Sequence, residues 1–157
     1  MILKPVVIDN WYTKSELKQV YKELDFYTDK EKLVSQHGNV AVEDGRDKAD
    51  CYRVPLTTYY SPEGQKLSNI LTLMHKVRDK KFHDYITKVC GIYHGFQHTG
   101  QSSSLLAYYE DTQYYESHTD TCKYTIMIWI NKEPKKFTGG NLILPDLKEK
   151  IECKNNR

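Results

Sequence analysis

The second half of the chain consists of short runs of strand-forming residues separated by turn residues. These runs are Leu105–Tyr109, Tyr124–Asn131, Asn141–Leu144 and Lys148–Cys153. Short strands at such regular spacing are typical of an antiparallel sandwich or barrel. The pattern therefore predicts a β core that begins near residue 101 and is still being built at residue 157.

The first hundred residues carry two helical patterns instead. Thr13 and Glu16 form a capping box, in which each side chain satisfies a backbone donor at the start of a helix. The apolar residues that follow recur at helical spacing: Leu17, Val20, Tyr21 and Leu24. A second apolar series keeps the same period over residues 67–89 and indicates one helix, or two helices broken near Asp79. Packing of both apolar stripes against a sheet explains them, and the fold class we expect is α+β.

Other segments of the first hundred residues predict strands and a loop. Val6–Ile8 is a short apolar run that predicts a strand. The polar residues 36–50, with two glycines, predict a loop, with a brief strand at Val40–Val42 as an alternative within it. Cys51–Tyr60 is rich in Tyr, Thr and Val and predicts a strand interrupted at Pro55. The sequence Ser61-Pro62-Glu63 then predicts the cap and first turn of the next helix.

Composition excludes several classes of protein. The 157 residues suffice for one domain, and 39% hydrophobic with 28% charged residues excludes a collagen or a fully disordered chain. A net charge of +2 is too small to indicate nucleic-acid binding, and no apolar run is long enough to predict a membrane span. The four cysteines form no C-x-x-C pair, which argues against a thiolate zinc site. We therefore expect a cytoplasmic protein with reduced thiols.

The sequence His118-Thr119-Asp120 is the strongest local indication of chemistry. On an extended segment, residues i and i+2 point to the same face, so this imidazole and this carboxylate project together. Such a pair is two thirds of the facial triad of two histidines and one carboxylate that holds non-haem Fe(II). The tripeptide alone is equally compatible with a surface histidine at the end of a strand.

The residues around this tripeptide resemble the Fe(II)/2-oxoglutarate-dependent dioxygenases of the prolyl 4-hydroxylase type. Tyr109 precedes His118 by nine residues, the run Tyr124–Asn131 ends in Trp-Ile-Asn, and Gly139-Gly140 leads into the next strand. The resemblance implies a single oxygenase-like domain over residues 1–157. In it, residues 1–100 are a helical support region with flanking strands. Residues 101–157 are the first part of a double-stranded β-helix, or jelly roll, whose C-terminal strands are missing.

The resemblance also implies a role for individual residues. His118 and Asp120 are the expected ligands of Fe(II). Tyr109, Thr125 and Trp129 are expected to line the pocket of the co-substrate 2-oxoglutarate, and Trp129 stands where relatives often have a tyrosine. Ascorbate is a further candidate cofactor. The implied reaction is hydroxylation of a prolyl or other side chain of a peptide or protein, with a small-molecule substrate as the other option.

The family pattern is incomplete in this chain. No histidine follows His118, so the third iron ligand, a downstream histidine, is not present, and no basic clamp for 2-oxoglutarate can be assigned. We therefore expect residues 1–157 to be inactive alone and to expose an unpaired sheet edge that favours self-association. The alternative is a non-catalytic or degenerate jelly-roll binding module; a cupin-like metal-binding barrel is disfavoured because its multi-histidine cluster is absent.

Two weaker candidates lie outside this pattern. His94 and His98 are four residues apart, as metal ligands on one helical face are. Gly91 and Gly95 argue against a helix there, and structural or surface roles are favoured. Cys122 lies two residues beyond Asp120 and is interpreted as a bystander close to the expected iron site.

Overall fold

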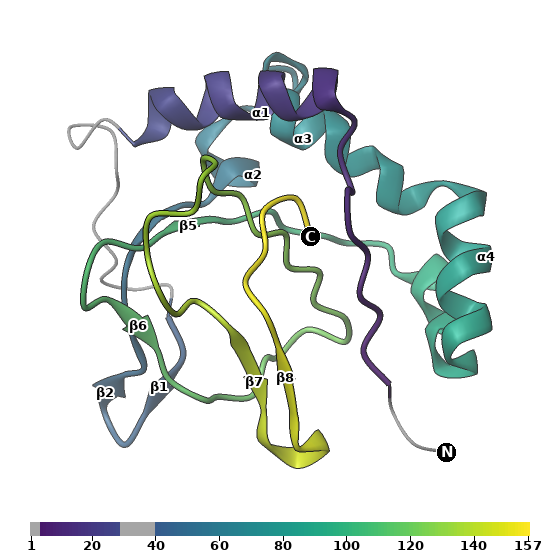
Figure 1. Cartoon of the computed structure of the whole chain (residues 1–157). Coiled ribbons are helices and arrows are strands. Elements are labelled where there is room, and N and C mark those ends of the chain that lie inside the picture. Colours follow the sequence, from purple (N-terminus) through teal and green to yellow (C-terminus); the bar gives the residue numbers. More distant parts are fainter. Residues whose placement is uncertain (1–3, 29–39) are drawn as a thin grey trace.

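The computed structural model describes residues 4–28 and 40–157 and combines helices with small sheets (Figure 1). The four α-helices and four 3₁₀ helices of this part of the chain are α1 (Lys14–Tyr27), α2 (Leu56–Tyr59), η1 (Gln65–Leu67), α3 (Asn69–Met74), η2 (His75–Arg78), α4 (Lys80–Val89), η3 (Gly91–His98) and η4 (Pro145–Leu147). Across residues 4–28 and 40–157, no helix has the length and apolar character needed to cross a membrane.

The strands form four antiparallel pairs. These are β1 (Val42–Glu43) with β2 (Arg46–Asp47), β3 (Ala49–Asp50) with β6 (Tyr114–Tyr115), β4 (Tyr52–Val54) with β5 (Leu106–Tyr108), and β7 (Leu142–Leu144) with β8 (Glu149–Ile151). The predicted strands at residues 105–109, 141–144 and 148–153 are thus confirmed in their central residues. No closed barrel is present among the described residues, so the jelly roll stays a prediction.

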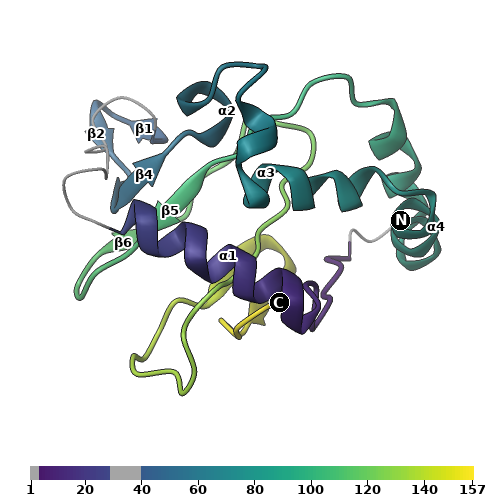
Figure 2. The same ribbon diagram turned by 90° about the horizontal axis from the view of Figure 1, so that it is seen from above.

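Helix α1 covers the sheets from one side (Figure 2). Its predicted capping box is confirmed, because Glu16 N–H donates to Thr13 Oγ1 and Thr13 N–H donates to Glu16 Oε2. The Glu23 carboxylate accepts hydrogen bonds from Ser68 Oγ and Ile70 N–H and so attaches α1 to the start of α3. The first core cluster lies beneath this contact and contains Tyr27, Val54, Leu56 and Leu71.

A second core cluster lies between η2, α4 and η3. Val77, Ile86 and Phe96 are its buried members, and Val6 and Tyr124 pack against it. The prediction of a strand at Val6–Ile8 is wrong, since these residues form no ladder in the structure. The apolar run instead contributes the partly buried Val6 to this cluster, whereas Val7 is exposed.

The helices in the middle of the chain begin at other residues than predicted. Pro55 does end strand β4, but residues 56–59 form α2 instead of a continued strand, so that part of the prediction is wrong. Residues 61–64 form a turn rather than the start of a helix. Helix α3 begins at its cap Ser68, whose Oγ accepts from Leu71 N–H at 3.1 Å. The helical series breaks at Asp79, which caps α4.

The structure differs from the predictions for residues 40–50 and for residues 124–131. Residues 36–39 of the predicted loop lie outside the described residues, and residues 40–50 contain the short strands β1, β2 and β3. The run Tyr124–Asn131 is not a strand in the structure, although its sequence is strongly strand-forming. A strand needs a partner ladder. Among the described residues, the backbone bonds of this run are those between Trp129 and residues 156–157.

Asn156 joins the two ends of the chain to this run. Its Oδ1 accepts from Tyr12 N–H and its Nδ2 donates to Tyr12 O, both at 2.8 Å. Its own N–H donates to Trp129 O at 2.7 Å, and its carbonyl accepts from Trp11 N–H. Asn156 is buried and has a φ of 59°, a left-handed conformation that asparagine tolerates better than most residues.

Salt bridges beside Asn156 reinforce this junction. Arg157 and Lys154 both donate to the carboxylate of Asp9, at 2.7 Å and 3.0 Å. The hydrogen bonds from these two cations, first from Arg157, lower the pKa of Asp9 to about 2. The carboxylate is exposed, so the contribution to stability is small compared with that of the buried Asn156 amide.

We predict that Asn156→Ala lowers the free energy of unfolding by about 2–4 kcal/mol, because it removes two buried hydrogen bonds and places alanine at a positive φ. Urea denaturation followed by circular dichroism measures the change. Lys150→Ala, on the exposed face of β8, is the control and is expected to change stability by less than about 0.5 kcal/mol. Equal effects of the two substitutions would contradict this role of Asn156.

Helix η3 packs closely against the side chain of Tyr124. A Cβ atom at Gly95 would lie 2.6 Å from the Tyr124 hydroxyl, which itself donates to Ile92 O. Gly95→Ala is therefore expected to destabilise the protein by about 1–3 kcal/mol, and the penalty is expected to shrink when it is combined with Tyr124→Phe, which removes the hydroxyl. A double-mutant cycle by thermal denaturation tests this; an unchanged penalty in the Tyr124→Phe background would contradict the contact.

Candidate metal centre

His118 and Asp120 lie together on the exposed segment that follows β6. His118 Nε2 is 3.1 Å from Asp120 Oδ1, as expected for residues i and i+2 of an extended chain. The side chains are 23% and 42% exposed, so both remain accessible from solvent. Two atoms that coordinate one metal ion at about 2.1 Å and at right angles are about 3.0 Å apart. The observed separation therefore matches that of two neighbouring ligands.

One ring nitrogen of His118 bonds to the carbonyl of Glu116, and the other ring nitrogen faces Asp120. His118 Nδ1 lies 2.8 Å from Glu116 O, and a carbonyl oxygen can only accept, so Nδ1 carries a hydrogen. In neutral His118, Nε2 then has a lone pair that faces a carboxylate oxygen. This lone pair is the group that a histidine uses to coordinate a metal ion. Such a bond from the second nitrogen to a carbonyl is typical of metal-binding histidines.

Asp120 is oriented by a hydrogen bond of its own. Thr125 Oγ1 donates to Asp120 Oδ2, which leaves Oδ1 directed at His118. The Thr125 hydroxyl thus holds the carboxylate, and its place in the co-substrate pocket stays a prediction. Cys122 Sγ lies 3.2 Å from the same hydroxyl, so this exposed thiol is close to the pair.

Tyr115 supports the imidazole of His118. Its ring stacks on the His118 ring with 4.0 Å between centroids and 11° between planes. The guanidinium of Arg53, which is 5% exposed, lies 4.8 Å from the centre of the same Tyr115 ring. Tyr115 lies on β6, which pairs with β3, and Arg53 lies on β4, which follows β3 along the chain. No motif in the sequence indicates this contact.

Glu116 fixes the start of the segment that carries His118. Arg46 donates to both carboxylate oxygens of Glu116, at 3.1 Å and 2.8 Å, and Lys48 makes a third contact with it. The backbone N–H of Glu116 donates to Lys48 O. The carbonyl that orients His118 therefore belongs to a residue held by both its side chain and its main chain.

Tyr109 lies near this group but contacts other residues. Although 43% of Tyr109 is exposed, its hydroxyl end faces Cys51, Arg53 and Tyr115. Burial of the hydroxyl, followed by the effects of Cys51, raises the pKa of Tyr109 well above its usual range. The phenol therefore stays protonated near neutral pH and can act as a hydrogen-bond donor.

The indole N–H of Trp129 donates to a residue outside the group around His118 and Asp120. The indole Nε1–H donates to Gly140 O at 3.0 Å, so its polar atom holds the Gly139-Gly140 turn. Both glycines have a positive φ, which explains why glycine suits this turn. The structure thus joins His118, Asp120 and Thr125 through hydrogen bonds, whereas Tyr109 and Trp129 bond to other partners.

His118 and Asp120 match two of the three protein ligands of a facial-triad iron site. An imidazole nitrogen and a carboxylate oxygen, each oriented by a second hydrogen bond, are suitable ligands for Fe(II). Within residues 4–28 and 40–157, no group of three or more His, Cys, Asp or Glu side chains is arranged to hold a metal ion. The third ligand is therefore not assigned by the described residues.

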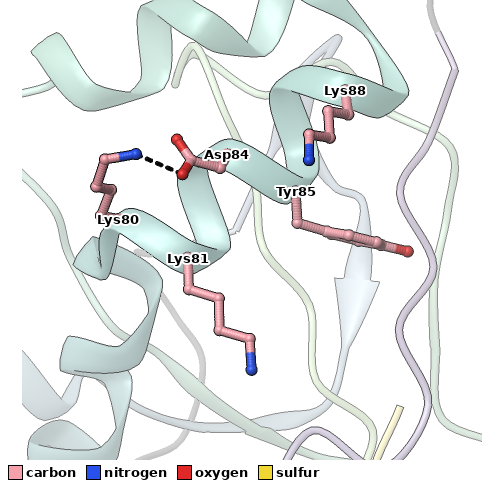
Figure 3. Close-up of a pocket in the computed structure, with 5 residues that line it drawn as sticks. All are labelled: Lys80, Lys81, Asp84, Tyr85 and Lys88. Atoms are coloured by element: carbon pink, nitrogen blue, oxygen red, sulfur yellow. Dashed lines mark hydrogen bonds and ion pairs between the residues drawn. The ribbon is translucent and has the colours of Figure 1, made fainter.

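An open hollow of about 480 Å³ lies on α4, away from the residues above (Figure 3). Lys80, Lys81, Asp84, Tyr85 and Lys88 line it, and Lys80 is paired with Asp84. Lysines on a solvated helix face are common on protein surfaces, and we assign the hollow no function.

Comparison of the chain with protein-family models, with curated proteins and with solved structures gave no match.

The contact between Thr125 and Asp120 predicts an effect on metal affinity. Thr125→Val keeps the shape of the side chain but removes the hydroxyl, so the affinity for Mn²⁺, a substitute for Fe(II), is expected to fall about 10- to 100-fold. Titration followed by the electron paramagnetic resonance of free Mn²⁺ measures it. Thr125→Ser retains the hydroxyl and is expected to bind like the wild type. Wild-type affinity in Thr125→Val would show that the hydroxyl does not orient the ligand.

Proposed function

We propose that this protein is an Fe(II)- and 2-oxoglutarate-dependent oxygenase that hydroxylates a prolyl or other side chain of a peptide or protein. One observation carries the proposal: His118 Nε2 and Asp120 Oδ1 face each other at 3.1 Å, each oriented by a separate hydrogen bond. The spacing of Tyr109, the His-x-Asp tripeptide and the Gly-Gly turn supports it by resemblance.

His118 and Asp120 would hold the metal ion in this function. Fe(II) and 2-oxoglutarate, when bound, supply the oxidising power for hydroxylation of a C–H bond. The protein contributes the position of the ion: Glu116 O keeps the Nε2 lone pair of His118 directed outward, and Thr125 keeps one carboxylate oxygen directed at the same point. Both groups are thus placed before the ion arrives, which lowers the cost of ordering them on binding.

The surroundings of the pair support a substrate that approaches from solvent. Both ligand side chains are partly exposed, and the segment that carries them lies at the surface. A side chain presented by a peptide or protein can reach such an open site more easily than a buried cavity. The cytoplasmic location stays a prediction.

Ligand-dependent stabilisation tests the proposal. Anaerobic thermal denaturation with Mn²⁺ and 2-oxoglutarate at about 100 times the dissociation constant is expected to stabilise the wild type by about 2.7 kcal/mol. His118→Ala and Asp120→Ala are expected to abolish the stabilisation. His75→Ala, which removes an exposed histidine of η2, is the matched control and is expected to retain it.

Two results would contradict the proposal. Stabilisation that persists in both His118→Ala and Asp120→Ala would place the ion elsewhere. Absence of any stabilisation in the wild type at saturating Mn²⁺ and 2-oxoglutarate would favour the non-catalytic binding module instead.

A further inference from the structure

A second group of histidines lies far along the chain from His118, where η3 packs against α4 at the right of Figure 1. His83 lies on α4, and His94 and His98 lie on η3. The ring centroids of His83 and His94 are 5.6 Å apart, and those of His94 and His98 are 5.8 Å apart. His94 is therefore the central member of a row of three imidazoles.

These separations are close to those of imidazoles that share one metal ion. A zinc–nitrogen bond of about 2.1 Å plus about 1.2 Å from the nitrogen to the ring centre places each centroid about 3.3 Å from the ion. At the tetrahedral angle, two such centroids are about 5.4 Å apart. The observed separations exceed this value by about 0.2 Å and 0.4 Å, which a small rotation of the rings can remove.

Two of the imidazoles already direct a nitrogen at a common point. His94 Nε2 and His98 Nε2 lie 3.0 Å and 3.1 Å from the same atom, the side-chain nitrogen of Gln97. The amide group thus occupies the place where two imidazole nitrogens converge. A cation there would replace a hydrogen-bond donor that the two nitrogens now share.

The third imidazole lies near a carboxylate that is itself paired with a lysine. His83 Nδ1 lies 3.9 Å from Asp84 Oδ1, and Asp84 also forms a salt bridge with Lys80. His83 Nε2 faces His94 O and Thr87 Oγ1, both at 3.4 Å, which are long contacts that a turn of the ring would break at little cost. Without that rotation the three nitrogens do not converge at coordination distance.

We propose that His83, His94 and His98 bind a divalent transition-metal ion, with Zn²⁺ as the best fit, that ties η3 to α4. Three imidazoles with an open fourth position are an established donor set for this ion. The sequence indicates only the spacing of His94 and His98; the fold supplies His83. Such an ion would also stabilise the surface on which Tyr124 packs, because Tyr124 contacts Phe96 of η3.

The experiment must separate this site from His118 and Asp120, which can also bind Zn²⁺. We therefore use the full chain carrying His118→Ala and Asp120→Ala, and titrate it with Zn²⁺ by isothermal titration calorimetry. One Zn²⁺ ion per chain is expected to bind. Adding His83→Ala, His94→Ala or His98→Ala is expected to weaken binding at least about tenfold. Adding His75→Ala, the matched control, is expected to leave it unchanged.

A second readout reports on the same residues directly. In proton NMR spectra, the imidazole signals of His83, His94 and His98 are expected to shift on addition of Zn²⁺, while that of His75 stays in place. Circular dichroism confirms that each variant is folded. Absence of Zn²⁺ binding in the His118→Ala, Asp120→Ala background, or unchanged affinity in any of the three histidine variants, would overturn the site.

Discussion

The buried side chain of Asn156 connects three segments that are distant in sequence. Its amide bonds to both backbone groups of Tyr12, and its main chain bonds to Trp129 and Trp11. These bonds hold the N-terminal segment against the run that follows His118 and Asp120. Because most strand pairs of the described residues are only two or three residues long, tertiary contacts of this kind position the segments more than the ladders do.

Contacts with other residues also orient the two side chains of the candidate metal centre. His118 and Asp120 are near neighbours in sequence, yet their orientation comes from elsewhere: Glu116 is held by Arg46, and Asp120 by Thr125. These bonds place Nε2 of His118 and a carboxylate oxygen 3.1 Å apart, close to the separation of two neighbouring ligands of one metal ion. The proposed function rests on that geometry, and the resemblance to 2-oxoglutarate-dependent oxygenases suggests the reaction.

The sequence predicted the features that depend on local patterns. The capping box of Thr13 and Glu16 was confirmed, and so was the pairing of His118 with Asp120 on one face, because both follow from spacing along the chain. Predictions of structure that depends on pairing or contact with another segment of the chain were less accurate. Residues 124–131 have strand-forming side chains but no ladder, and the contact of Arg53 with the Tyr115 ring joins segments that are distant in sequence, which no local pattern shows.

A crystal structure of the protein grown with Fe(II) under anaerobic conditions tests the central claim most directly. Anomalous scattering at the iron edge locates the ion without reference to activity. The account predicts one iron about 2.1 Å from both His118 Nε2 and an oxygen of Asp120, with His118 Nδ1 still bonded to Glu116 O and Thr125 still bonded to Asp120. Iron bound elsewhere, with the His118–Asp120 pair unchanged, would contradict it.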